Sequence, residues 1–487
     1  MFKGQPKGLY ALALANTGER FGYYTMLAVF ALFLRANFGL DAGVAGTIYS
    51  TFLGLVYFMP LIGGIMADKF GFGKMVTSGI FIMFIGYLLL SFPLGGDTLA
   101  MIAMLGALLF ISVGTGLFKG NLQVMVGDLY NDPQYAAKRD SGFSLFYMAI
   151  NIGALFAPTA AVKIKEWAEF SLGYSGNDAY HFSFAVACAS LILSIAIYYI
   201  FRPTFRHVEG GAKKKGEEAR ERDTLTPEQT KARMVALFLV FAVVIFFWMA
   251  FHQNGLALTY FADEFTAKSS EGLQSMAFNV WNLALIIIAV YAGFSFFQSE
   301  EAKTKIVSAA IVLGVIGILV YKYLNITGSI AVSAPIFQQF NPFYVVALTP
   351  VSMAIFGSLA AKGKEPSAPR KIAYGMLVAA IGFVIMAVGS DGLNTPNEQQ
   401  RAIAVDKAET FAKEYYTIAP TAEALEAMKE DAEYAAKVKP ATDFMGKLTQ
   451  NTKPIFFDVY NSQSIIAAND ANTEENSSIV AEATATL

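Results

Sequence analysis

Charged residues, histidine and cysteine are all scarce in this chain. Only 15% of its 487 residues are charged, while 55% are hydrophobic and the mean hydropathy is +0.47, which indicates a membrane protein rather than a soluble domain. The single cysteine, Cys188, excludes a disulfide framework and a cysteine-rich metal site. The three histidines, His181, His207 and His252, are scattered and form no His-Glu-x-x-His motif. We therefore predict no enzyme, no metal site and no cofactor, and the net charge of -2 gives no indication of a nucleic-acid partner.

Long apolar segments are abundant, and each is close to the ~20 residues that a helix needs to cross the hydrocarbon core of a bilayer. The sequence therefore predicts an all-α polytopic membrane protein with about eleven transmembrane helices. The segments lie at residues 9–34, 43–67, 75–94, 99–126, 141–164, 180–201, 234–252, 277–297, 305–323, 341–361 and 373–389.

The distribution of Lys and Arg predicts the orientation, because cytoplasmic loops carry an excess of these residues. The connection at 203–233 is rich in them, including the run Lys213 to Lys215, and we expect it to be a cytoplasmic linker. Counting helices from this linker places the N-terminus in the cytoplasm. We expect a multi-pass protein of the plasma membrane, such as a bacterial inner membrane, in contact with the lipid bilayer.

The first apolar segment contains Asn-Thr-Gly-Glu-Arg-Phe-Gly-Tyr-Tyr at residues 16–24. Glu19 and Arg20 would lie in the middle of a spanning helix, where ionised side chains are costly and usually functional. We expect them to face each other or a polar cavity.

Several motifs carry a resemblance to a known family. Six helices, a charged cytoplasmic loop and further helices resemble the two halves of major facilitator transporters, and residues 63–74 are similar to the Gly-x-x-x-Asp-Arg-x-Gly-Arg-Arg loop of that superfamily. Residues 16–24 resemble the Glu-x-x-Glu-Arg-Phe-x-Tyr-Tyr motif of the proton-dependent oligopeptide transporter family. Similar matches follow at 114–121, 127–130, 139–153, 247–255 and 337–342.

The resemblance implies a major facilitator fold and a peptide-binding site. A di- or tripeptide is a zwitterion whose carboxylate needs a cation, and Arg20 and Lys119 are the intramembrane cations that could supply it. Four further residues match family positions that hydrogen-bond the peptide, namely Tyr23, Tyr57, Asn151 and Asn341. A structural Glu19–Lys119 ion pair, and packing roles for the tyrosines and asparagines, remain the alternatives.

Three positions depart from the family pattern. Asn16 replaces the first Glu of the motif and cannot carry a proton, His252 replaces a Glu of the seventh helix, and Leu27 replaces the Arg that pairs with that Glu in an outer gate. Both members of the gate pair have changed, so neither is left buried and unpaired. Proton coupling is expected to fall to Glu19, Lys119 and His252, since histidine titrates near ~6.5.

We predict an N-terminal six-helix bundle at 1–202, the linker at 203–233, an incomplete C-terminal bundle at 234–389 and a polar, acidic extracytoplasmic tail at 390–487. Residues 277–324 form an inserted helix pair that we expect to pack outside the bundle. The tail is expected to be a truncated loop domain or the end of a shortened protein, whose missing helices would come from another chain.

Three functions are compatible with these features. The first is a secondary active transporter that imports di- and tripeptides by alternating access, driven by protons through altered coupling residues. The second is a transporter of another small substrate, such as nitrate or an organic anion, because lost carboxylates leave a cavity biased toward anions. The third is a truncated membrane protein that does not transport.

Overall fold

The computed structural model describes residues 4–210 and 226–391, and these residues confirm the predicted all-α membrane architecture. Within these described residues, eleven helices are long and apolar enough to cross a membrane. In chain order they are α1 (Lys7–Phe38), α2 (Ala42–Phe70), α3 (Phe72–Leu90), α4 (Thr98–Asp128), α6 (Arg139–Ser171), α7 (Tyr180–Ile200), α8 (Pro227–Phe251), α11 (Val280–Gln298), α12 (Ala302–Leu324), α13 (Phe340–Ala361) and α14 (Ala368–Gly389).

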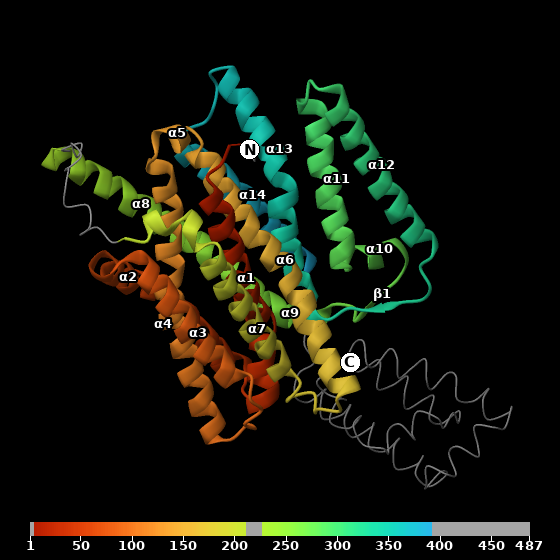
Figure 1. Cartoon of the computed structure of the whole chain (residues 1–487). Helices are drawn as coiled ribbons and strands as arrows, with labels where there is room; N and C mark the ends of the chain where they lie inside the picture. The colour runs from red at the N-terminus through yellow and green to blue at the C-terminus, as the bar shows by residue number, and fades with distance from the viewer. Residues whose placement is uncertain (1–3, 211–225, 392–487) are drawn as a thin grey trace, which may run out of the picture. The chain divides into compact units, whose positions relative to one another are not determined.

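Short elements connect these helices (Figure 1). The α-helical ones are α5 (Pro133–Ala136), α9 (Ala257–Phe265) and α10 (Gly272–Ala277), and the 3₁₀ turns include η1 (Leu129–Asn131), η2 (Arg202–Thr204), η3 (Arg206–Val208), η5 (His252–Gly255) and η6 (Ala334–Gln339). Two strands of two residues, β1 (Ser269–Ser270) and β2 (Ile330–Ala331), pair antiparallel.

Contacts divide the chain into two compact units. Among the described residues, the first contains 4–210, 226–260, 272–328 and 333–372, and the second contains 261–271, 329–332 and 373–391. Both cavities described below lie within the first unit. The predicted tail falls almost entirely on residues 392–487, which lie outside the described residues, as does the middle of the predicted linker, 211–225. The last part of that linker is helical, because α8 begins at Pro227 with a capping box between Thr226 and Gln229.

The first six spanning helices pack closely because small residues lie where they cross. A Cβ atom on Gly63 of α2 would lie 2.2 Å from the carbonyl oxygen of Gly116 on α4, and one on Gly79 of α3 would lie 2.6 Å from that of Gly114. The backbones therefore touch directly, and one continuous hydrophobic core fills the space between these helices.

A Gly63→Leu variant is expected to lose about 3 kcal/mol of stability or more, the upper end of the cost of overpacking, since backbone rather than a flexible side chain must move. Gly64→Leu is the matched control, because a Cβ atom on the neighbouring Gly64 meets nothing within 4 Å. Thermal unfolding of both purified variants in one detergent tests this. Equal midpoints for the two variants would show that the α2–α4 contact does not limit stability.

The inserted pair, α11 and α12, forms a helical hairpin whose two members lie side by side (Figure 1). Val280 and Leu283 of α11 pack with Leu155 of α6 and with Phe343 and Ala347 of α13 in a small hydrophobic cluster. Helix α11 thus packs one apolar face against α6 and α13, and the expectation that the pair packs outside the bundle stays a prediction. The second helix, α12, buries little beyond its contacts with α11.

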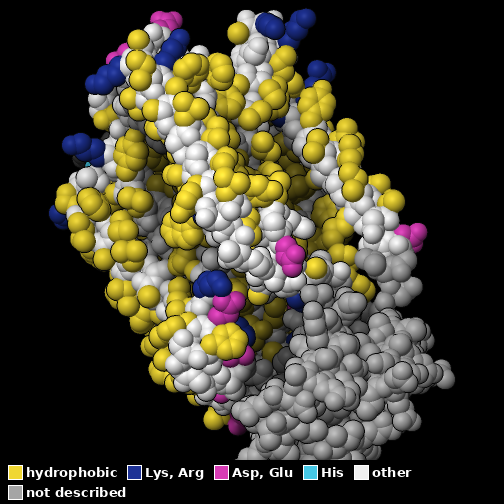
Figure 2. Space-filling view, turned by 90° about the vertical axis from the view of Figure 1, so that its right-hand side faces the viewer, with side chains coloured by type: hydrophobic (Ala, Val, Ile, Leu, Met, Phe, Trp, Pro, Cys, Tyr) yellow, Lys and Arg dark blue, Asp and Glu magenta, His cyan; other side chains and the backbone are white. Residues whose placement is uncertain are grey.

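The outer surface of the described helices is largely apolar. Figure 2 shows hydrophobic side chains over most of the described surface on the face that it draws. Helix α8 has no buried residue, although it is strongly hydrophobic. Such surfaces are costly in water and are expected where helices contact lipid.

Candidate substrate-binding cavity

A cavity of about 290 Å³ lies between α1, α2, α4, α6, η5 and the start of α13. This volume is near the lower end of the range of small-molecule sites, roughly 300–1,000 Å³. The structure brings seven of the predicted residues to its wall, and these are Arg20, Tyr23, Tyr57, Lys119, Asn151, His252 and Asn341. Leu27 also lines it, whereas Glu19 and Asn16 are buried behind it.

Arg20 is neutralised by its neighbour in the chain. Its Nε and Nη2 atoms donate to the two carboxylate oxygens of Glu19, and both residues are almost completely buried. The guanidinium carbon also lies 4.6 Å from the ring centroid of Tyr23. Because each charge has its partner within α1, this pair is a preformed polar feature of the cavity wall.

Lys119 is not neutralised by a carboxylate. Its ammonium nitrogen lies 4.7 Å from the ring centroid of Tyr57, and it makes no hydrogen bond or ion pair with any residue of 4–210 or 226–391. The Glu19–Lys119 ion pair that the sequence left open therefore does not form here, since Glu19 is occupied by Arg20. The cavity wall thus carries a half-buried cation that lies over an aromatic face and has no hydrogen-bonded carboxylate among the described residues.

His252 also contacts the ring of Tyr57. It is the first residue of η5, directly after α8 ends at Phe251. Its ring lies 5.4 Å from that of Tyr57 in an edge-on contact and is stacked 5.7 Å from that of Trp248. Tyr57 of α2 therefore contacts both Lys119 of α4 and His252, so the two titratable groups belong to one cluster.

Two asparagines, Asn151 of α6 and Asn341 of α13, also line the cavity. The side-chain amide of Asn151 donates to the carbonyl of Tyr147, one turn earlier on α6, at 2.9 Å. Asn341, near the start of α13, has an exposed side chain in the cavity. Amides at these two positions offer donors and acceptors that suit a peptide backbone.

Neutral contacts close the cavity at the carboxyl-terminal end of α1. The amide of Gln338 donates to the carbonyl of Ala28 at 3.2 Å and to the hydroxyl of Thr259 at 3.0 Å. The Tyr260 hydroxyl donates to the carbonyl of Ala31 at 3.2 Å. These bonds join α1 to the segments that follow α8, at the end where the family pattern predicts a charged gate.

Glycine is required at one point of this closure. A Cβ atom on Gly255 would lie 2.0 Å from the hydroxyl of Tyr49 on α2, so only a residue without a side chain allows this approach. Close packing and hydrogen bonds to backbone carbonyls therefore hold this end of the cavity.

Sequence reasoning did not single out several lining residues. Gln338 and Trp248 stood inside motifs that carried the family resemblance, but no role was assigned to them. Tyr147 could have been found from its spacing, because it lies four residues before Asn151 and so shares its helix face. Tyr49 and Gln123 also line the cavity, and no sequence signal marked them.

Comparison with known proteins places the chain in a family. The model of the POT family matches residues 73–221 and 323–410. Over 426 residues the chain is 30% identical to the uncharacterized transporter YclF of Bacillus subtilis, covering 81% of this chain and 77% of that relative. The chain belongs to the POT family. This confirms the peptide-transporter family that the motifs predicted.

Other relatives of this POT family chain carry more specific names. It is 27% identical to the dipeptide and tripeptide permease B of Salmonella typhimurium, over 80% of this chain and 75% of the permease. It is also 27% identical to the di-/tripeptide transporter of Lactococcus lactis, over 80% and 76%. These relatives are transporters rather than enzymes, in line with the prediction from the scattered histidines.

The fold agrees with solved structures of the family. The crystal structure of a POT family transporter in complex with a thioalcohol conjugated peptide superposes with a TM-score of 0.50 at 22% identity, covering 80% of this chain and 78% of that one. The major facilitator architecture predicted from the motifs is thus the architecture of this multi-pass membrane protein.

Proposed function

We propose that this POT family protein imports di- and tripeptides across the plasma membrane by alternating access, coupled to protons through altered residues. The observation that carries the proposal is the cavity in which Lys119, an uncompensated cation, faces tyrosine hydroxyls and asparagine amides. Names of relatives, which include dipeptide and tripeptide permeases, support the substrate class.

The carboxylate of the peptide would bind primarily to Lys119. The half-buried ammonium of Lys119 is stabilised by an opposite charge, and a substrate carboxylate would supply the paired counter-ion that the described residues do not. Arg20 already uses two of its nitrogens for Glu19, so it would hold Glu19 and offer the carboxylate its remaining nitrogen. Tyr23, Tyr57, Asn151 and Asn341 would hydrogen-bond the peptide backbone.

The proposed orientation of the chain in the membrane follows from the charges of its loops. The Lys- and Arg-rich connection between α7 and α8 favours a cytoplasmic N-terminus. The contacts of Gln338 and Tyr260 with α1 would then close the cavity on the outer side. This arrangement corresponds to a state that is open to the cytoplasm in an alternating-access cycle.

His252 would carry the proton-sensing role that Asn16 cannot fill. Its ring shares Tyr57 with the ammonium of Lys119, and Arg20, paired with Glu19, lines the same cavity. Protonated His252 and Lys119 would repel each other unless a substrate carboxylate lies nearby, so proton and peptide would favour each other's binding. The neutral form of histidine dominates above its ordinary pKa of about 6.5.

A His252→Gln variant should therefore lose most of the pH dependence of uptake while still binding dipeptide. In proteoliposomes, wild-type uptake is expected to rise as the outer pH falls from about 7.5 to about 5.5, and uptake by the variant should stay nearly flat. Dipeptide affinity measured at one pH serves as the control for folding. An unchanged pH profile in the variant would exclude His252 as the sensor.

A small anion is the second candidate substrate. The residues that line the cavity include Arg20, Lys119 and His252 but no Asp or Glu among the described residues. Uptake of labelled dialanine into proteoliposomes, with nitrate as competitor, separates the two candidates. Peptide transport predicts uptake that nitrate does not inhibit, whereas nitrate uptake without dialanine uptake would overturn the proposal.

A further inference from the structure

A second cavity, of about 350 Å³, lies where α2 ends and α3 begins. It is built from the segment that resembles the superfamily loop together with the turns that follow α7, so it shares no lining residue with the substrate cavity. Six charged side chains line it, and these are Asp68, Lys69, Lys74, Arg202, Arg206 and Glu209.

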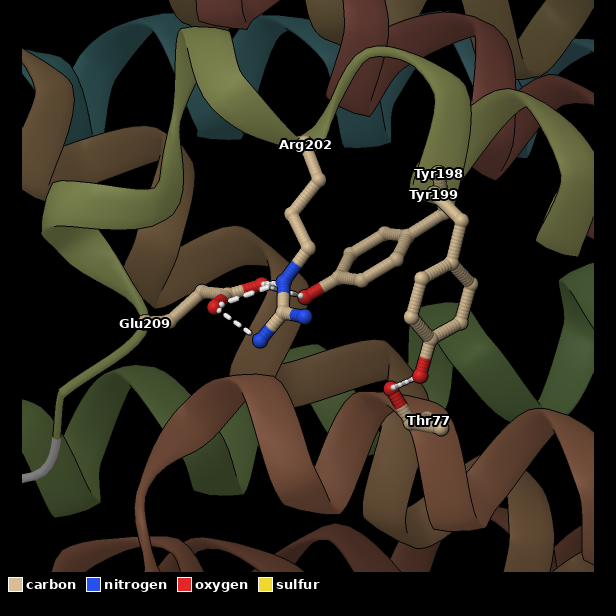
Figure 3. Close-up of polar contacts among 5 residues, drawn as sticks. All are labelled: Thr77, Tyr198, Tyr199, Arg202 and Glu209. Atoms are coloured by element: carbon tan, nitrogen blue, oxygen red, sulfur yellow. Dashed lines mark hydrogen bonds and ion pairs between the residues drawn. The ribbon is translucent and has the colours of Figure 1, made fainter.

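Two of the six charges cancel each other in a fixed brace (Figure 3). Arg202 donates from Nε to Oε1 of Glu209 at 2.8 Å and from Nη2 to Oε2 at 2.8 Å, and the Tyr198 hydroxyl donates to Oε1 at 2.9 Å. The backbone amide of Gly73 also donates to the carbonyl of Glu209 at 3.1 Å. These bonds tie the turns after α7 to the start of α3, and they leave the carboxylate of Glu209 with little capacity for another cation.

Three cations remain around the cavity. Lys69, Lys74 and Arg206 make no hydrogen bond or ion pair with any described residue, and Asp68 is the one other lining carboxylate. The cavity wall therefore has an excess positive charge beyond the Arg202–Glu209 pair. Gly71 precedes α3 without a side-chain cap, so the first amides of this 19-residue helix, apart from that of Gly73, add partial positive charge at the same place.

The cavity adjoins surface that is suited to hydrocarbon. Phe70, at the end of α2, lines it and is 57% exposed, and Ile200 and Phe201, just before Arg202, are also exposed. A ligand that fits both features has an anionic phosphate and an apolar tail. Bases between helix ends on the cytoplasmic side of a membrane are a recurrent setting for such headgroups.

We propose that this cavity binds the phosphate group of an anionic phospholipid through Lys69, Lys74 and Arg206, with the Arg202–Glu209 brace holding the site in shape. The acyl chains would lie along Phe70 and Phe201. A free phosphate anion shares the headgroup chemistry, and the experiment below distinguishes the two sources.

The test is a titration of the purified full chain in a neutral detergent with three probes, namely dioctanoyl phosphatidylglycerol, dioctanoyl phosphatidylcholine and inorganic phosphate. We expect phosphatidylglycerol to bind more tightly than phosphatidylcholine. Combined Lys69→Gln, Lys74→Gln and Arg206→Gln substitutions should weaken its affinity on the order of a hundredfold, from the contribution of three cations near an anionic lipid.

Two further variants test whether the loss of lipid affinity is specific to these three positions and to their charge. Lys303→Gln, Lys362→Gln and Lys364→Gln remove the same charge from exposed positions predicted to be on the same membrane side, and this variant should retain wild-type affinity. The charge-preserving Lys69→Arg, Lys74→Arg and Arg206→Lys combination should also bind. Phosphate that displaces the lipid at similar concentration would assign the site to a free anion. Equal losses in the two Gln variants, or equal binding of the two lipids, would overturn the proposal.

Discussion

An Arg20→Gln variant is expected to lose about 3–5 kcal/mol of folding free energy, the cost of removing one partner of a buried ion pair. Glu19 has no exposed surface, and the guanidinium of Arg20 supplies both of its hydrogen bonds. Removing the guanidinium leaves a carboxylate inside a membrane-spanning helix without its counter-ion. The measurement is the unfolding midpoint of the purified variant and its yield from the membrane.

The Glu19→Gln, Arg20→Gln double variant is the comparison that tests this explanation. Replacing both members of a buried pair by neutral groups is often nearly neutral for stability, so the double variant should be more stable than Arg20→Gln alone. Lys163→Gln is the external control, because Lys163 pairs with Glu166 on the surface, where such pairs contribute about 0–1 kcal/mol. If Arg20→Gln is as stable as the double variant, the Glu19–Arg20 ion pair does not contribute to the stability of the fold.

Lys119→Gln is expected to reduce dipeptide affinity by about a hundredfold, or about 2.7 kcal/mol, which lies in the lower part of the roughly 2–5 kcal/mol lost on truncating one partner of a desolvated charge pair. Lys119 is the cavity cation that has no anionic partner among the described residues, so the substrate carboxylate would be its counter-ion. Lys119→Arg keeps the charge and should retain part of the affinity. Titration of the purified variants with dialanine gives these values directly.

A blocked peptide identifies the group that Lys119 contacts. Dialanine amide lacks the carboxylate, and it should bind to wild-type protein about as weakly as dialanine binds to Lys119→Gln. If the two groups contact each other, the loss from amidation and the loss from the substitution are not additive. Additive losses of binding affinity would show that the carboxylate of dialanine does not contact Lys119 and binds elsewhere in the cavity.

The helices and the family were predictable because their signals are local. Each spanning segment must satisfy its own backbone and present apolar side chains to lipid, so a run such as 373–389 indicates a helix without knowledge of its neighbours. The motif at 16–24 identified both the family and the position of Glu19 and Arg20 for the same reason. Asn16 and Leu27 were recognisable as departures because the rest of their motif is intact.

These patterns did not show which side chains contact each other, either within a helix or between helices. Residues adjacent in a helix do not normally face each other, yet the long side chain of Arg20 folds back onto Glu19. That local pairing leaves Lys119, one hundred positions away in the chain, without the partner that the sequence also allowed. Likewise α11 packs against α6 and α13, although its hydrophobic run looks the same as that of α12.

The membrane class, the eleven spans, the family and the identities of the cavity's charged residues were predictable from local sequence patterns alone. The three-dimensional structure was needed to show that Glu19 neutralises Arg20, that Tyr57 contacts both Lys119 and His252, and that Gln338 and Tyr260 donate to carbonyls of α1. Periodicity and motifs specify each helix separately, whereas side-chain orientation within a helix and distances between side chains from different helices depend on how the helices pack.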